Sequence, residues 1–174
     1  ATSAPLTKVI GVDGVRLPYV EQGSGEPIVL VHGAFSDLRV WEPIREEVAK
    51  RYRFIAYTQR YFGTEPWPDD GKNFSIRTDA DDLAKFLTSL NAGPVHLVTR
   101  SRGGGVGMAA ALKNPALVRT RTLHEPALLS VLPADSPEGK AAREDREKFT
   151  SAAIAANKAG DPIRTTQIFM EGVY

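Results

Sequence analysis

The residues best suited to chemistry form one short segment, Thr99-Arg100-Ser101-Arg102-Gly103-Gly104, which follows the apolar run Val95–Val98. The run predicts a buried strand, and the small residues after Ser101 predict a tight turn into a helix. A serine at the apex of such a turn projects its hydroxyl from the carboxyl edge of the sheet. The N–H of Arg102 would lie at the helix start, where partial positive charge favours an anion. Acyl transfer needs this arrangement of an exposed nucleophile beside oxyanion donors.

Two other polar segments follow apolar runs in the same way. His32-Gly33-Ala34-Phe35 follows Pro27–Val31, and Gln59-Arg60-Tyr61-Phe62-Gly63 follows Arg53–Tyr57. Together the three segments resemble the HG loop, the D-x-R-G-x-G loop and the nucleophile elbow, G-x-S-x-G, of the α/β-hydrolase superfamily. The resemblance covers roughly Lys8–Leu132. It implies that Ser101 is the nucleophile and that the N–H groups of Arg102 and of Ala34 or Phe35 form the oxyanion hole.

The segments depart from the family pattern at several positions. Thr99 replaces the first glycine of the elbow, and Thr58 and Tyr61 replace the Asp and Gly of the middle loop. Arg100 and Arg102 bracket the nucleophile. They are interpreted either as a preference for an anionic substrate or, more simply, as charges that face solvent or pair with a carboxylate.

The partners of a catalytic serine are only partly present in the sequence. Family resemblance implies an acid and a His base, usually after the last two strands, but some subfamilies place the acid after the sixth strand. Glu125 occupies that position and is the candidate acid; the alternative is a structural loop carboxylate. The three histidines, His32, His96 and His124, do not lie where the base should be. A His outside this chain is therefore expected.

Binding residues are harder to assign. Trp41 and Arg100 are the candidate substrate-binding residues, with Phe35, Phe62 and Trp67 as further aromatic side chains for an acyl pocket; all the aromatics could equally be core residues. No His-containing acidic cluster suggests a metal, and the expected reaction needs no cofactor.

The elements that must position these residues follow from periodicity and turn signals. The expected strands are 7–12, 15–20, 27–31, 53–57, 95–98 and 118–123, the first two forming a hairpin around Asp13-Gly14. The expected helices are 41–48, 76–90, 104–113, 138–159 and 162–171, with a possible cap at Thr78 for the second. This alternation predicts an α/β fold with a mostly parallel sheet and helices on both faces, like an α/β-hydrolase without its last two strands.

The organisation predicted is an N-terminal part of an α/β-hydrolase core over 1–132 and a helical cap-like segment over 133–174. Arg119-Thr120-Arg121-Thr122 suits a sheet edge better than the interior, so Arg121 is expected to be exposed or ion-paired. An open edge invites strand pairing. A complementary C-terminal chain or self-association is therefore expected.

Composition excludes several other classes. The net charge is +1, which gives no field for nucleic acid, and the absence of cysteine excludes disulfides and thiolate chemistry. No apolar run approaches the roughly 20 residues of a membrane span. With no targeting segment in view, a cytoplasmic location is favoured. The expected partner is a small-molecule substrate.

Two other functions compete with a serine hydrolase of a small ester or related acyl compound. Gly105-Val106-Gly107-Met108-Ala109-Ala110 fits a dinucleotide fingerprint, with Glu125 at the acidic position. That segment, however, is expected inside a helix rather than at its start. The other alternative is a non-catalytic binding module of α/β-hydrolase type, favoured by the missing His and the replaced glycine.

Overall fold

A computed structural model describes residues 6–173 of the chain. Its contacts divide the chain into two units, one ending at Ala127 and one beginning at Leu128. The division falls slightly before the predicted boundary between 132 and 133. The first unit contains the sheet and every residue singled out for chemistry, and the second contains two long helices.

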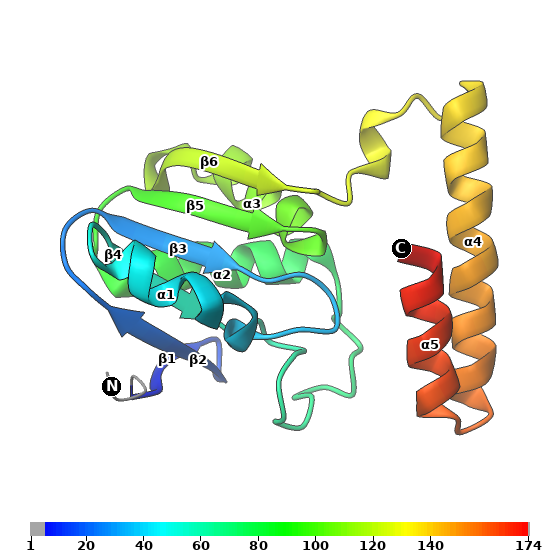
Figure 1. Ribbon diagram of the computed structural model, residues 1–174, viewed down its shortest axis with the longest axis horizontal. Coiled ribbons are helices and arrows are strands. Elements are labelled where there is room, and N and C mark those ends of the chain that lie inside the picture. Colours follow the sequence, from blue (N-terminus) through cyan, green and yellow to red (C-terminus); the bar gives the residue numbers. More distant parts are fainter. Residues whose placement is uncertain (1–5, 174) are drawn as a thin grey trace. The chain divides into compact units, whose positions relative to one another are not determined.

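The first unit is built on one six-stranded sheet with the order β1-β2-β4-β3-β5-β6 (Figure 1). The strands are β1 (Lys8–Val12), β2 (Val15–Gln22), β3 (Pro27–Val31), β4 (Arg53–Tyr57), β5 (Val95–Arg100) and β6 (Val118–His124). β2 runs antiparallel to both β1 and β4, whereas β4, β3, β5 and β6 are mutually parallel. The predicted fold class, a mostly parallel sheet, is confirmed.

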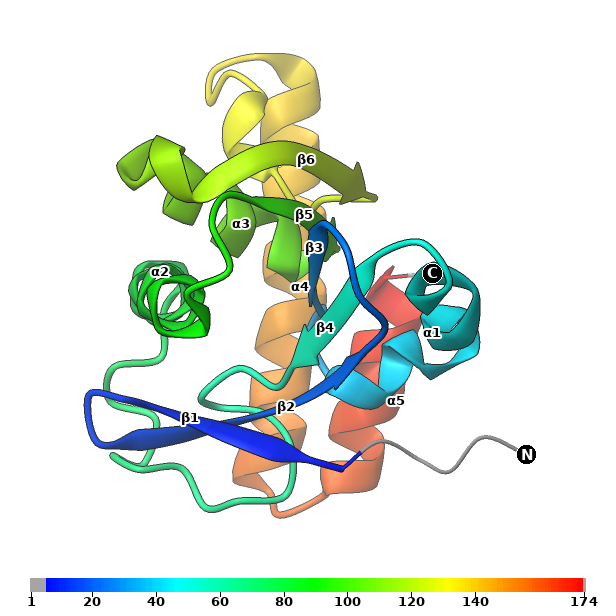
Figure 2. The ribbon, with the colours of Figure 1, turned by 90° about the vertical axis from the view of Figure 1, so that its left-hand side faces the viewer.

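Helices cover both faces of this sheet, as Figure 2 shows: α1 lies on one face, and α2 and α3 lie on the other. Their bounds are α1 (Glu42–Ala49), α2 (Ile76–Leu90) and α3 (Arg102–Lys113), with short 3-10 turns at Leu38–Trp41 and Pro115–Leu117. Strand alternation sends side chains to each face in turn. Thus Ile55 and Tyr57 pack with α2 and α3, while Phe54 and Ala56 pack with α1.

Two local expectations were wrong. The side chain that caps α2 is Ser75, which accepts a hydrogen bond from the N–H of Thr78; Thr78 already lies in the first turn. α3 begins at Arg102 rather than at 104, because the helix follows Ser101 directly and includes the two glycines after Arg102. In α1 the residue buried is Arg45, held by Glu42 at 2.6 Å, whereas Ile44 is exposed.

β6 lies at the edge of the sheet and, within the described residues, pairs with β5 alone. After its half-buried first residue, Val118, every residue of the strand is exposed. Arg121 is exposed, with Nη1 3.6 Å from Met108 Sδ, so the prediction for this residue is confirmed. A charged edge of this kind differs from the buried central strands β3 and β4.

The second unit is a helical hairpin of α4 (Pro137–Lys158) and α5 (Pro162–Val173), preceded by a short 3-10 turn at Leu129–Val131. Gly160 turns the chain between the helices with φ 76°, and Phe149 meets Phe169 edge to face at 6.0 Å between ring centroids. Among residues 6–173, no helix has both the length and the apolar character to cross a bilayer.

Candidate active site

Ser101 occupies a strained turn between β5 and α3. Its backbone dihedrals are φ 50° and ψ −122°, a conformation that a residue with a side chain adopts only when its surroundings enforce it. Hydrogen bonds supply that constraint. The Ser101 N–H donates to His124 O at 3.0 Å, and the Ser101 carbonyl accepts from the N–H groups of Gly104 at 2.8 Å and Ala127 at 3.2 Å. The Ser101 side chain does not cap α3.

Two glycines permit the close approach of the elbow and the HG loop. A Cβ on Gly103 would lie 2.5 Å from His32 O and 2.7 Å from Val31 O, so only glycine fits against that backbone. A Cβ on Gly33 would lie 3.1 Å from Ser101 Cβ and 3.6 Å from its Oγ. The loop after β3 therefore lies against the serine side chain.

Thr99, the residue in place of the first elbow glycine, is accommodated by α3. The threonine is fully buried and its hydroxyl donates to Thr122 O at 3.3 Å. A Cβ on Gly107 would lie only 2.6 Å from the Thr99 methyl group. Gly107 on α3 thus leaves the space that the Thr99 side chain needs, so a threonine fits at the position of the first elbow glycine.

His32 is a structural residue of the loop. The Gln59 N–H can only donate, so His32 Nε2 accepts it at 3.1 Å, and Nδ1 carries the proton that it donates to Gly33 O at 2.7 Å. Burial lowers the pKa of His32 to about 4. The imidazole is therefore neutral at pH 7, with both nitrogens occupied.

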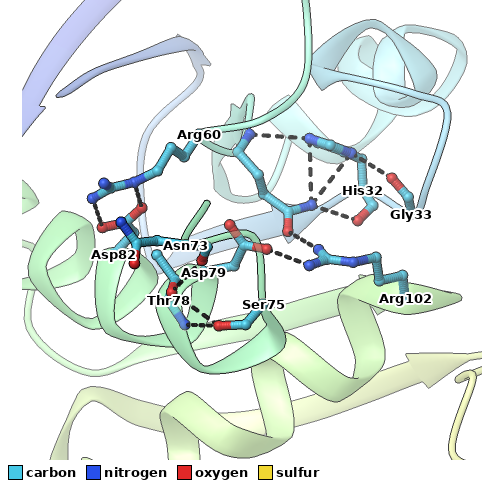
Figure 3. A network of polar contacts seen from close by, with 10 residues as sticks. His32, Gly33, Arg60, Asn73, Ser75, Thr78, Asp79, Asp82 and Arg102 are labelled. Atoms are coloured by element: carbon cyan, nitrogen blue, oxygen red, sulfur yellow. Dashed lines mark hydrogen bonds and ion pairs between the residues drawn. The ribbon is translucent and has the colours of Figure 1, made fainter. Parts of the chain in front are cut away.

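The Arg102 side chain belongs to a buried network that starts from the same histidine (Figure 3). Gln59 Nε2 donates to His32 O at 2.8 Å, and Arg102 Nη1 donates to Gln59 Oε1 at 3.2 Å. Arg102 Nη2 donates to Asp79 Oδ2 at 2.5 Å, and the guanidinium lies 4.6 Å from the centroid of the Phe74 ring. Of the two interpretations of Arg102, pairing with a carboxylate is the one that its side chain shows, because Asp79 engages the guanidinium.

A second buried ion pair lies beside the first. Arg60 donates to Asp82 through Nε and Nη2, both at 2.7 Å. The two departures in this loop also have structural roles: the Thr58 hydroxyl accepts from Leu38 N–H at 3.2 Å, and the buried Tyr61 donates to Asp69 at 3.0 Å. The roles of Gln59, Asp79 and Asp82 could not be predicted from the sequence. Two carboxylates one helical turn apart on α2 carry no local signal that they pair with Arg102 and Arg60.

Positive φ angles recur at the carboxyl edge of the sheet. Besides Ser101, Phe35 after β3 has φ 51° and Glu125 after β6 has φ 45°. Phe35 is 57% exposed, Ala34 is half-buried and Glu125 is exposed. Glu125 directly follows His124, whose carbonyl holds the elbow, so the candidate acid is tied to the candidate nucleophile through one peptide.

The two candidate binding residues lie in different surroundings. Trp41 is only 8% exposed and packs with Val20, Leu30 and Phe54 on the α1 face, which is the position of a core residue. Its Nε1 is buried with no hydrogen-bond partner among residues 6–173. Arg100, the last residue of β5, is half-buried next to Ser101.

Of the other two histidines, His96 lies away from Ser101 along β5, and His124 lies at the end of β6. His96 lies five residues before Ser101, about 16 Å along an extended strand, and contacts Thr120 at 2.7 Å and Glu26 at 2.9 Å. His124 is exposed at the end of β6. Within the described part of the chain, no group of three His, Asp or Glu side chains is arranged to hold a metal.

The dinucleotide alternative does not fit the geometry. Gly105 and Gly107 lie inside α3, and Gly107 packs on Thr99 and Leu97 instead of forming a strand-to-helix turn. The helix N-terminus follows Ser101 directly. The fingerprint match is thus explained by helix packing on the sheet.

Comparison with known proteins agrees with this geometry. The sequence profile of the alpha/beta hydrolase fold matches residues 26–159. The 2-(acetamidomethylene)succinate hydrolase of Mesorhizobium japonicum is 31% identical over 115 residues, which are 66% of this chain and 41% of that protein.

Two solved structures are similar as well. Cfl2 from Burkholderia cenocepacia superposes with a TM-score of 0.67 at 30% identity, covering 75% of this chain and 45% of that one. The epoxide hydrolase CorEH gives a TM-score of 0.64 at 28% identity, covering 69% and 42%. The chain spans less than half the length of the curated relatives that it matches. With the family profile matching most of its residues, the chain belongs to the alpha/beta hydrolase fold family.

Proposed function

We propose that the protein carrying this chain is a serine hydrolase of a small ester or related acyl compound, with Ser101 as its nucleophile. The observation that carries the proposal is the strained turn at Ser101, packed against Gly33 of the HG loop. Strain of this kind costs about 1–3 kcal/mol and persists where it serves a function. A serine with only a structural role would have no need of it.

In the proposed reaction Ser101 Oγ attacks the substrate carbonyl carbon and its proton passes to a base. The tetrahedral oxyanion accepts hydrogen bonds from the N–H of Arg102 and from that of Ala34 or Phe35. Arg102 is the first residue of α3, so its N–H has no partner within the helix. Collapse expels the protonated leaving group, and water then hydrolyses the acyl-serine.

The nucleophile type favours acyl chemistry over epoxide opening. Serine attack on an epoxide carbon would leave an ether, which water does not readily cleave, whereas serine attack on an acyl group leaves an ester. The named activity of the Mesorhizobium relative is hydrolysis of an acetamido compound, so amides belong in the substrate panel beside esters. An epoxide belongs there as the contrasting substrate.

The base is proposed to be a histidine that this chain does not contain, oriented by Glu125. His32 has both nitrogens engaged and His96 lies far along β5. Glu125 stands at the carboxyl edge beside the elbow, and its φ of 45° is positive like that of the serine. Replacing Glu125 with Gln is expected to lower kcat while leaving acyl-serine formation detectable.

We further propose that β6 is paired in the working protein by a complementary C-terminal segment or a second copy. In the described residues its outer edge has no strand beside it, and unpaired edges attract partners. The test is the mass in solution and the esterase rate of residues 1–174. Association or slow turnover is expected, and a monomer with ordinary serine-hydrolase turnover would contradict the proposal.

The function itself is tested by comparing the wild-type protein with Ser101→Ala on p-nitrophenyl esters of increasing chain length, on anilides and on an epoxide. Turnover of an acyl substrate is expected in the wild type and a loss of several orders of magnitude in the variant. Equal turnover in both, with equal stability, would refute the assignment of Ser101.

A further inference from the structure

We propose that the Arg102 side chain is a positioning residue, which holds the two sides of the oxyanion hole together through Gln59. This inference rests on the proposed function. Arg102 would thus have two roles. Its backbone N–H would donate to the oxyanion, and its guanidinium would hold the HG loop, which carries the other donor, in place.

The connection is continuous and short. Gln59 contacts the HG loop at two points: its backbone N–H binds His32 Nε2 at 3.1 Å and its side-chain Nε2 binds His32 O at 2.8 Å. The remaining Gln59 atom, Oε1, accepts from Arg102 Nη1 at 3.2 Å. His32 in turn donates to Gly33 O, one residue before the donor pair Ala34 and Phe35. Arg102 at the start of α3 is therefore linked to the loop after β3 by hydrogen bonds alone.

The guanidinium is itself firmly held. Its other arm reaches Asp79 Oδ2, on a carboxylate whose side chain is 0% exposed, while the Arg102 side chain is 14% exposed. The planar group lies over Phe74 at 4.6 Å and Phe62 at 5.4 Å. Burial raises the pKa of Asp79, and the charge of Arg102 opposes that rise. The planar fork of the guanidinium presents separate N–H donors to the carboxylate and to the amide at once.

The chain offers a matched control. Arg60 and Asp82 form an ion pair that is about as buried as the pair of Arg102 and Asp79. Arg60 directly follows Gln59 in its loop, and Asp82 lies three residues after Asp79 on α2. The contacts of Arg60 run to Asp82 and Tyr61 rather than to the HG loop. Loss of this pair is expected to lower stability without moving the oxyanion donors.

The experiment compares Arg102→Met, Gln59→Leu, the double variant and Arg60→Met in the protein that carries this chain. Each is assayed on the best ester, with active sites counted by covalent labelling with a fluorophosphonate. Arg102→Met and Gln59→Leu should each lower kcat about 10- to 100-fold with little change in KM, since misplaced donors weaken transition-state binding only. The double variant should be no worse than either single variant, because both break one connection.

A second readout does not depend on turnover. Burial is the main cause of the low pKa of His32, and the charge of Arg102 lowers that pKa by a smaller amount. Arg102→Met should therefore raise the pKa of His32 slightly above about 4 in a ring-nitrogen NMR titration, and Arg60→Met should not. Millimolar guanidinium should restore part of the kcat lost in Arg102→Ala. Gln59→Leu keeps the ion pair intact, so it tests the link even if Arg102→Met does not fold.

The proposal is overturned if kcat per labelled site in Arg102→Met or Gln59→Leu stays within about twofold of wild type. It is overturned equally if Arg60→Met lowers kcat as much as Arg102→Met. Failure of the proposed function has a different signature, namely a wild-type protein that shows neither esterase turnover nor labelling at Ser101.

Discussion

Gly33, in the loop after β3, and Ser101, directly after β5, are so close that a Cβ on the glycine would lie 3.1 Å from the serine Cβ. The same atom would lie 3.4 Å from Arg100 O. The Ser101 side chain thus has the HG loop on one side, and a Cβ added at Gly33 requires the loop or the serine to shift by a few tenths of an ångström.

Gly33→Ala is accordingly expected to lower esterase kcat several-fold, because the added carbon shifts the loop or the serine by a few tenths of an ångström, and a full shift of roughly 1 Å at reacting groups costs about 100-fold. The matched control is Gly11→Ala, where nothing lies within 4 Å of the added carbon. Its kcat and melting temperature should stay close to wild type. A Gly33→Ala variant with wild-type kcat would show that the loop does not border the reacting group.

Gly103→Ala should lower the free energy of unfolding by about 1–3 kcal/mol, as overpacking against rigid backbone does. The added carbon would meet His32 O at 2.5 Å. Gly105→Ala in the same helix has only Ile76 nearby, at 3.6 Å, and should be neutral or stabilise by up to about 1 kcal/mol. Urea titration of both variants measures the contrast, and equal effects would contradict the close packing.

The pH dependence of stability should carry the signature of His32. Its folded pKa of about 4 lies below the ordinary 6.5, so the unfolded chain binds more protons between these values. Stability is therefore full above pH 6.5 and is lost as pH falls, by about 3 kcal/mol at pH 4, given about 1.4 kcal/mol per pH unit. Urea titrations between pH 7 and 5 avoid most carboxyl titration. His32→Gln should flatten the slope; an unchanged slope would contradict a buried neutral His32.

Ser101→Gly should be more stable than Ser101→Ala, although both lack the nucleophile. At φ 50° and ψ −122° glycine relieves a strain that alanine retains, and the difference is expected to be about 1 kcal/mol or more. Melting of the two variants under one condition measures it. A Ser101→Ala variant of equal or greater stability would show that the turn is not strained.

The sequence predicted the sheet well because its signals are local. Apolar runs such as Pro27–Val31 and Arg53–Tyr57 match β3 and β4 residue for residue. The strand-to-helix turn at Ser101 was likewise predictable, since the strand, the serine and the small residues are contiguous in the sequence. The role of Arg102 was not, because its partners Gln59 and Asp79 are 43 and 23 residues away and become neighbours only through the fold. The burial of Trp41 could not be predicted either, because its position in the expected helix suits a core residue and a pocket residue equally well.

The central claim, that Ser101 is an activated nucleophile, is tested most directly by a fluorophosphonate probe. The protein carrying this chain is incubated with the probe, digested, and the modified peptide located by mass spectrometry. The account predicts one adduct on Ser101, absent from Ser101→Ala and formed more slowly in Gly33→Ala. An intact, folded protein that gains no adduct at Ser101, or gains it equally at other serines, would contradict the account.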